Sequence, residues 1–100
     1  MIAVIGTYRI PVEHMDAVKG PMADVIAATR QEEGCILYSF GEDVLEPGLI
    51  RVCERWESRE HLKAHVESGH MKVWAGYREK FAFYDRDIKV YDIAAEGQTV

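Results

Sequence analysis

Three of the four histidines lie close together in the chain, at His61, His65 and His70, and imidazole is the side chain best suited to proton transfer near neutral pH. His61 and His65 are four residues apart, a spacing that can place two imidazoles on one metal ion when the segment is helical. Metalloprotease helices carry a glutamate directly after the first histidine, but here that residue is Leu62. We therefore expect no metal site, either from this pair alone or with His70 or His14 as a third ligand.

The sequence around these histidines predicts different roles for them. Ser58 can cap a helix over residues 59–67, and on that helix His65 borders the apolar side whereas His61 points toward solvent. His70 begins the next helix, where the positive end of the helix dipole favours the neutral imidazole. His65 and His70 are therefore the candidate catalytic bases. Two alternatives stay open: a His65 at the core edge, bonded to a backbone carbonyl, and a His70 that faces water.

An alternating segment just before the histidines places an acid among aromatic side chains. Residues 49–57 are predicted to form a strand that pairs with residues 35–43 through a turn near Glu46. The register of this hairpin decides which side chains share the face that meets the helices. The expected cross-strand pairs are Ile36 with Trp56, Tyr38 with Glu54, and Phe40 with Val52.

Several of these side chains are candidates for binding a flat ligand. An apolar, partly aromatic cavity with a few polar groups is a common form of small-molecule site, although aromatic residues more often only fill a core. Burial beside aromatic rings would also raise the pKa of Glu54 into the working range of a base. The candidate substrate-binding residues are Trp56, Tyr38, Phe40, Glu54 and Trp74.

The apolar periodicity along the chain predicts an α+β fold. Alternation over residues 2–10 and 87–93 indicates two further strands, and helical spacing predicts a helix from Glu13 toward Gly34 and another after Gly69. The order strand, helix, strand, strand, helix pair, strand is that of a ferredoxin-like split βαβ sandwich. Helices cover only one face of such a sheet, so we expect a second copy to cover the other and form a homodimer.

Individual residues make these expectations more specific. Gly20-Pro21 is expected to kink the first helix or to restart it, because proline lacks an amide donor and clashes with the preceding turn. In the helix over residues 59–67, Leu62 and Val66 are expected to point inward. Ile5 and Leu49, or the residues that alternate with them, are expected on the sheet face that the helices leave uncovered.

Composition limits the function further. One hundred residues with 48% hydrophobic content fit a single domain over residues 1–100. The net charge of -5 disfavours nucleic acid, and the apolar start has no basic leader and is too short to span a membrane, so we expect a cytoplasmic protein. Cys35 and Cys53 should stay reduced there. With no glycine-rich phosphate loop, we expect no flavin, nicotinamide or other cofactor.

Two groups of residues resemble a known family. Glu33-Gly34-Cys35 followed by Tyr38, and the ordered run from Glu54 to Met71 with its Glu-x-Trp-Glu-Ser, Ala-His and Ser-x-His-Met, are similar to the antibiotic biosynthesis monooxygenase domain, above all to its small quinol monooxygenases. The resemblance implies two sheets closed into a dimeric α/β-barrel. It also implies oxidation of a small quinol or hydroxylated aromatic by molecular oxygen, and assigns Trp56 and Tyr38 to the pocket.

The leading functional hypothesis is therefore a cofactor-independent monooxygenase with a small aromatic substrate. Its base would be His65 or His70, with Glu54 as the alternative, and the substrate itself would supply the electrons. Two other classes stay open, because one fold hosts many chemistries. These are an isomerase of a small phosphorylated or carbonyl metabolite and a non-catalytic dimeric ligand-binding module.

Overall fold

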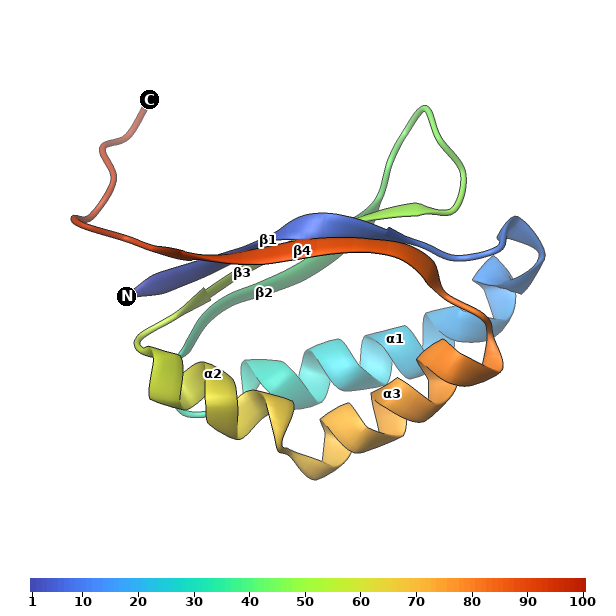
Figure 1. Ribbon diagram of the computed structural model, residues 1–100, viewed down its shortest axis with the longest axis horizontal. Helices are drawn as coiled ribbons and strands as arrows, with labels where there is room; N and C mark the ends of the chain where they lie inside the picture. Colours follow the sequence, from blue (N-terminus) through green and yellow to red (C-terminus); the bar gives the residue numbers. More distant parts are fainter.

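The computed structural model describes all residues from 1 to 100 and shows one antiparallel sheet covered on one face by three helices (Figure 1). The strands lie in the order β2-β3-β1-β4, which together with the order along the chain is the ferredoxin-like α+β arrangement predicted from the periodicity. None of the helices is long and apolar enough to cross a membrane. The elements are β1 (Ile2–Arg9), the short 3₁₀ turn η1 (Val12–His14), α1 (Met15–Arg30), β2 (Cys35–Glu42), β3 (Leu49–Trp56), α2 (Arg59–Val66), α3 (Gly69–Lys80) and β4 (Tyr84–Asp92).

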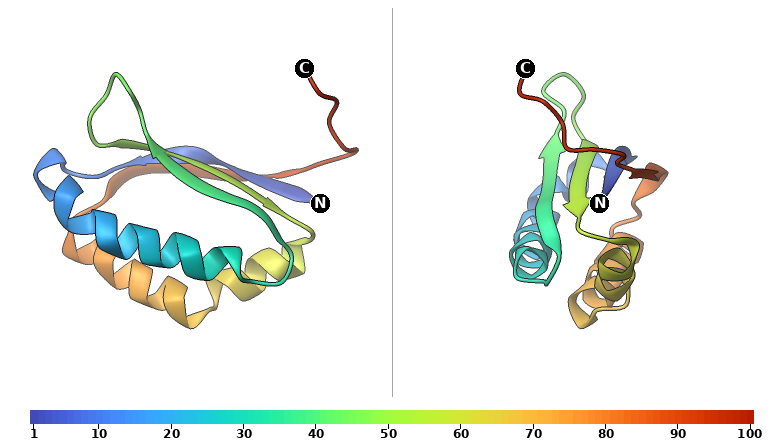
Figure 2. Two further views of the ribbon diagram at one scale, coloured as in Figure 1. Left: turned by 180° about the vertical axis from the view of Figure 1, so that it is seen from behind. Right: turned by 90° about the vertical axis from the view of Figure 1, so that its left-hand side faces the viewer.

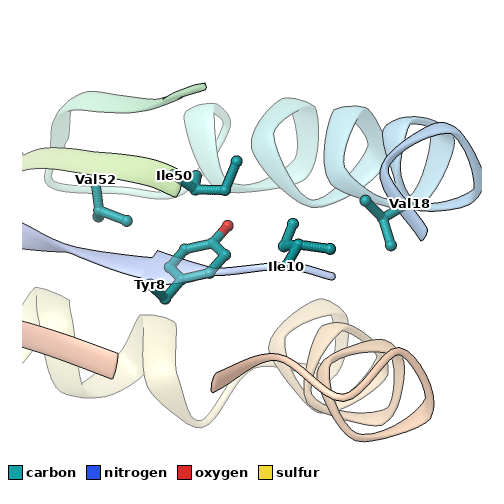
Figure 3. Packing of buried hydrophobic residues seen from close by; sticks show 5 residues of the cluster. All are labelled: Tyr8, Ile10, Val18, Ile50 and Val52. Atoms are coloured by element: carbon teal, nitrogen blue, oxygen red, sulfur yellow. The ribbon is translucent and has the colours of Figure 1, made fainter. Parts of the chain in front are cut away.

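The core lies between the sheet and the helices. Alternate residues of β1 and β3 point toward the helices and are buried, as the period of two predicts. One part of this core packs against the start of α1 (Figure 3), and the other surrounds Trp56. The residues drawn in Figure 3 are Tyr8, Ile10, Val18, Ile50 and Val52.

The register between β2 and β3 confirms two of the three expected pairs. Tyr38 lies opposite Glu54, and Phe40 lies opposite Val52. The third expected pair is wrong, because an irregularity between Cys35 and Leu37 places Cys35 opposite Trp56 and leaves Ile36 unpaired and 43% exposed. An inserted residue of this kind shifts the alternation of side chains by one position. Residues with odd numbers before the bulge and with even numbers after it therefore share the face toward the helices, as Cys35 and Tyr38 do.

Helix α1 runs without a break from Met15 to Arg30 and contains Pro21. Of the two alternatives expected at Gly20-Pro21, a kink or a restart, the restart is therefore wrong. The helix buries Val18, Val25 and Thr29 along one side, on both sides of the proline in sequence. Burial of this continuous stripe offsets the cost of about 3 kcal/mol that an interior proline imposes.

Helix α2 begins as predicted and faces the core differently. The Ser58 side chain accepts a hydrogen bond from the His61 amide and caps the helix. Leu62 is partly buried, but Val66 is 59% exposed and its predicted inward position is wrong. In an eight-residue helix only a narrow stripe meets the sheet, and here His65 occupies its centre.

Gly34 is a position with little room for a side chain. It has a φ of +82°, and a Cβ there would lie 2.2 Å from the ring of His61. Gly34→Ala should therefore lower the free energy of unfolding by about 1–3 kcal/mol, measured by urea denaturation.

A matched control separates this effect from the change of residue type. Gly76 lies within α3 and has open space around its Cβ position, so Gly76→Ala should stabilise the protein by about 0.5–1 kcal/mol. A double variant that combines Gly34→Ala with His61→Ala should regain the part of the free energy of unfolding that the steric contact costs. The part that is due to the positive φ of residue 34 should remain lost. Equal effects of the two glycine substitutions would contradict this account.

The far face of the sheet carries no helix, and Figure 2 shows all three helices on the opposite side. Ile5 is 50% exposed on that face, as expected, and Leu37 and Tyr91 are also exposed. Leu49 is buried, so its expected exposure is wrong; it lies at the base of the hairpin, where its carbonyl accepts from the Asp43 amide.

Candidate functional site

The predicted acid on β3 is buried in the middle of the structure. Glu54 faces the helices and is 7% exposed. The indole Nε1 of Trp56 donates a hydrogen bond of 2.9 Å to its Oε1. Burial raises the pKa of Glu54 from 4.5 to about 7, although the Trp56 hydrogen bond and the charge of Arg86 lower it. A carboxyl group of this kind can take or give a proton near neutral pH.

The predicted base on α2 lies beside this acid, within the core. His65 is 2% exposed, with its ring centroid 4.8 Å from that of Trp56 and 5.2 Å from that of Tyr38. Burial lowers its pKa, while the neighbouring carboxylate of Glu32 raises it. The net direction is downward, which favours the neutral imidazole that a base requires.

Glu32 holds the orientation of this imidazole and was missed by the sequence analysis. Its Oε2 lies 2.6 Å from Nδ1 of His65, so a neutral ring that donates from Nδ1 leaves Nε2 as the acceptor. The side-chain hydrogen bond of His65 is made at Nδ1. The available signal was that Glu32 directly precedes the Glu33-Gly34-Cys35 motif, but nothing local connects it to a residue 33 positions away.

The second predicted base is connected to the first through the same carboxylate. His70 Nε2 lies 3.1 Å from Oε2 of Glu32 and 3.2 Å from the Ser68 hydroxyl. The His70 ring centroid is 6.0 Å from that of His65. His70 lines a separate cavity of about 270 Å³ between α1 and α3, which Glu54 does not border. The structure thus places His65 and Glu54 on one cavity. His70 lies outside this cavity and is connected to His65 through Glu32.

Glu32, His65 and His70 are also the group that comes nearest to a metal-binding set. One ligand atom of each lies within 4.8 Å of the others. Two ligands on one tetrahedral zinc ion, with bonds of about 2.0–2.1 Å, lie about 3.3 Å apart. The 2.6 Å between Glu32 and His65 is shorter and fits a hydrogen bond. His61 belongs to a different contact, because its Nδ1 bonds to Ser58 at 2.7 Å and it is half-buried rather than solvent-facing.

Two cavities meet at Glu54 between the sheet and the helices. The larger has a volume of about 150 Å³, and both His65 and Glu54 line it. The smaller has a volume of about 30 Å³. The residues common to both are Glu54, Met71, Arg86 and Ile88.

The aromatic residues predicted to hold a ligand occupy different positions around these cavities. Tyr38, Phe40 and Trp74 line the smaller one. Trp56 is fully buried and borders neither cavity; it bonds to Glu54, and its ring lies beside those of His65 and Tyr38. The aliphatic side chains of the larger cavity were not predicted as site residues; they are Val4, Leu62, Val66, Ile88 and Val90.

These features define an α+β protein of ferredoxin-like fold in which a buried acid and a neutral histidine face one largely apolar cavity. The chain belongs to the antibiotic biosynthesis monooxygenase family, whose sequence model matches residues 1–77. The resemblance found in the motifs is thereby confirmed.

Individual relatives agree with this assignment. The protein named probable quinol monooxygenase YgiN of Escherichia coli K12 is 33% identical over 70 residues, which cover 62% of this chain and 67% of that protein. The protein sll1783 of Synechocystis is 28% identical over 99 residues, 99% of this chain and 67% of that one. A crystal structure from Deinococcus radiodurans superposes with a TM-score of 0.90 at 26% identity and covers 100% of this chain and 98% of that chain.

Proposed function

We propose that this protein is a cofactor-independent monooxygenase that oxidises a small quinol or hydroxylated aromatic with molecular oxygen. The observation that carries the proposal is the pairing of Glu54 and His65 on one apolar cavity of about 150 Å³. An engineered apolar cavity of about this volume binds benzene, so one aromatic ring fits. The name of the Escherichia coli relative supports a quinol as the substrate class.

The proposed mechanism begins with removal of a phenolic proton. Nε2 of His65 accepts it, and Glu32 stabilises the imidazolium that forms, because its carboxylate bonds to Nδ1. Glu54, with a pKa of about 7, faces the same cavity and exchanges the second proton. General-base assistance of this kind contributes typically about 10²–10⁴-fold to the rate.

The substrate supplies all the electrons in this scheme. The quinolate passes an electron to oxygen, and the two radicals combine to form a carbon–oxygen bond. Cleavage of the oxygen–oxygen bond then leaves one oxygen atom on the ring and releases the other as water. In sum, one quinol and one oxygen molecule give one hydroxyquinone and one water molecule, so atoms and electrons balance without an external reductant.

The remaining predicted residues support this reaction in our proposal. Trp56 positions Glu54 through its indole hydrogen bond. Tyr38, Phe40 and Trp74 form the aromatic boundary on the side of the smaller cavity and exclude water from the ring. His70 bonds to the same oxygen of Glu32 as His65 does and acts through this carboxylate.

Oxygen consumption with a panel of reduced quinones tests the function directly. The protein should accelerate oxygen uptake above autoxidation, and isotopically labelled oxygen gas should place one labelled atom in the organic product. No acceleration with any quinol would contradict the proposal. Exchange of a substrate proton without oxygen uptake would instead indicate the isomerase considered above.

We also propose that the protein functions as a homodimer through the uncovered face of the sheet. Exposed apolar side chains lie there on three strands: Leu37 on β2, Ile5 on β1 and Tyr91 on β4. Cys53 lies opposite Ile5, and Ala3 lies opposite Tyr91. Soluble monomers rarely expose large contiguous apolar patches, and a second sheet would cover this one.

Sedimentation or light scattering should therefore give a dimer at micromolar concentration, and Ile5→Lys should shift the protein toward monomer. Val44→Lys is a matched control, since Val44 is an exposed apolar residue in the hairpin loop, away from the strands of this face. A monomeric native protein, or an equal response to both substitutions, would contradict the proposed interface.

A further inference from the structure

The side chains of two arginines beside the proposed site, Arg78 on α3 and Arg86 on β4, form no ion pair or hydrogen bond within the protein. All five other arginines have a partner. Arg9 pairs with Glu46 and Asp85, Arg51 with Asp43, Arg55 with Glu96, and Arg59 with Asp92, while Arg30 donates to the carbonyl of Tyr38.

The lack of a partner has a cost for Arg78, which is partly removed from water, whereas Arg86 is exposed. The chain has more acids than bases, with 17 Asp and Glu against 12 Lys and Arg, so partners are abundant elsewhere on its surface. Arg78 is half-buried, and its burial and the nearby charge of Arg86 both lower its pKa. Two like charges held near each other favour an anion that contacts both.

The two side chains also face one space. Both line an open cavity of about 330 Å³, whose walls include Phe83 and Tyr84. Arg86 in addition lines the cavity of about 150 Å³ and the smaller one beside it. A ring bound in the cavity of about 150 Å³ therefore has Arg86 on the wall of its own cavity. Arg78 lies on the wall of the neighbouring open cavity, which Arg86 also lines.

A buried hydroxyl group lies on the same path. Tyr8 is buried, its hydroxyl has no hydrogen-bond partner, and it lines the smaller cavity together with Arg78 and Arg86. A buried polar group without a partner is costly unless a ligand or water satisfies it. The Tyr8 hydroxyl is thus a third donor for an acceptor that enters between the arginines.

We propose that Arg78, Arg86 and Tyr8 form an anion subsite, and that the hydroxylated aromatic bound beside Glu54 and His65 carries a carboxylate group. This inference rests on the proposed function, since it names the class of substrate that the same site takes. A planar carboxylate matches the paired donors of guanidinium groups and accepts an additional hydroxyl donor. Two acids line the cavities that these arginines line, and neither forms an ion pair with them. Glu79 is exposed on the wall of the cavity of about 330 Å³, and Glu54 lines the two inner cavities together with Arg86.

Equilibrium binding without oxygen tests the subsite independently of turnover. The probes are gentisate, a dihydroxybenzoate, and its neutral amide, which has the same ring and hydroxyl groups. Trp74 lines the smaller cavity, so its fluorescence can report binding. At low ionic strength the native protein should bind gentisate at least about tenfold more tightly than the amide, because charge-assisted hydrogen bonds contribute at least that much.

Substitutions then assign the preference to residues. Arg86→Gln and Arg78→Gln should each weaken gentisate binding by about tenfold and leave amide binding within about twofold. Tyr8→Phe should weaken only gentisate. Arg51→Gln is the matched control, because Arg51 pairs with Asp43 away from these cavities, and it should change neither affinity. Thermal unfolding of each variant verifies that it is folded.

The outcomes separate this inference from the proposed function. Equal affinity of the native protein for the two probes, or a preference that survives both arginine substitutions, overturns the subsite. Equal affinity is the result expected if an acid of a second copy of the chain pairs with the arginines in place of a ligand. A carboxylate preference without oxygen uptake from any quinol supports the subsite and overturns the monooxygenase. Oxygen uptake restricted to neutral quinols overturns the subsite alone.

Discussion

His65→Asn is expected to lower turnover of a quinol by about 10²–10⁴-fold, the usual contribution of a positioned general base. The asparagine amide nitrogen occupies nearly the position of Nδ1 and can still donate to Glu32, while the acceptor at Nε2 is lost. Folding and substrate affinity should therefore change little. Single-turnover measurements with a quinol, with autoxidation subtracted, give the rate of the chemical step.

His61→Asn is the matched control, because His61 lies on the same helix and bonds through Nδ1 to Ser58. Its turnover should stay within about threefold of the native value, since no transition-state contact is lost. Glu32→Gln should fall between the two variants and shift the acidic limb of the pH–rate profile, because it changes the basicity of His65 without removing the ring. A folded His65→Asn variant with full activity would show that His65 is not the base and would leave Glu54 as the candidate.

The native protein is expected to lose on the order of 3 kcal/mol of its free energy of unfolding as the pH rises, and Glu54→Gln should remove this loss. The carboxyl titrates near 4.5 in the unfolded chain and near 7 in the folded one, so the folded state binds more protons between these values. The native protein therefore loses stability as the pH rises from about 4.5 to about 7, with no further change from this group above that. The glutamine stays neutral, and its side-chain oxygen can accept the Trp56 hydrogen bond.

Urea unfolding across this pH range measures the difference between native and variant proteins, and titrations common to both cancel. The difference should be near zero below about pH 4.5 and should reach its full value in favour of Glu54→Gln above about pH 7. Glu67→Gln is the matched control, because Glu67 is an exposed glutamate at the end of α2. Its stability should follow that of the native protein across the pH range. Parallel curves for the native and Glu54→Gln proteins would mean that the carboxyl is not held neutral. Quinol turnover should also fall in Glu54→Gln if this group exchanges the second proton.

The elements of the fold follow from patterns between residues that are close in sequence. Alternation along β1 and β3 sets their buried faces, and the caps at Ser58 and Ser68 begin α2 and α3. Where such a pattern was insufficient, the prediction was wrong for a definable reason. The bulge at Ile36 depends on an extra residue that alternation does not register, and Pro21 stays inside α1 because burial along the whole helix outweighs a local penalty.

The difference between His61 and His65 was also determined in part by the sequence. Helical spacing places His65 near the apolar side of α2, and the structure buries it. The pairing of Tyr38 with Glu54 follows from the length of the hairpin and is confirmed. These two results place an acid and a base on neighbouring elements, which is as much of the site as local periodicity can specify.

Only the tertiary structure decided how these groups are connected. Glu32 reaches His65 across 33 residues because the turn that follows α1 lies beside the last turn of α2. Likewise, Arg78 and Arg86 are ordinary surface residues in the sequence, and their lack of partners depends on where every acid of the folded chain lies. Periodicity sets which side of an element is buried, since that depends on near neighbours. Cavities and contacts between distant elements depend on how those elements pack, which no local pattern encodes.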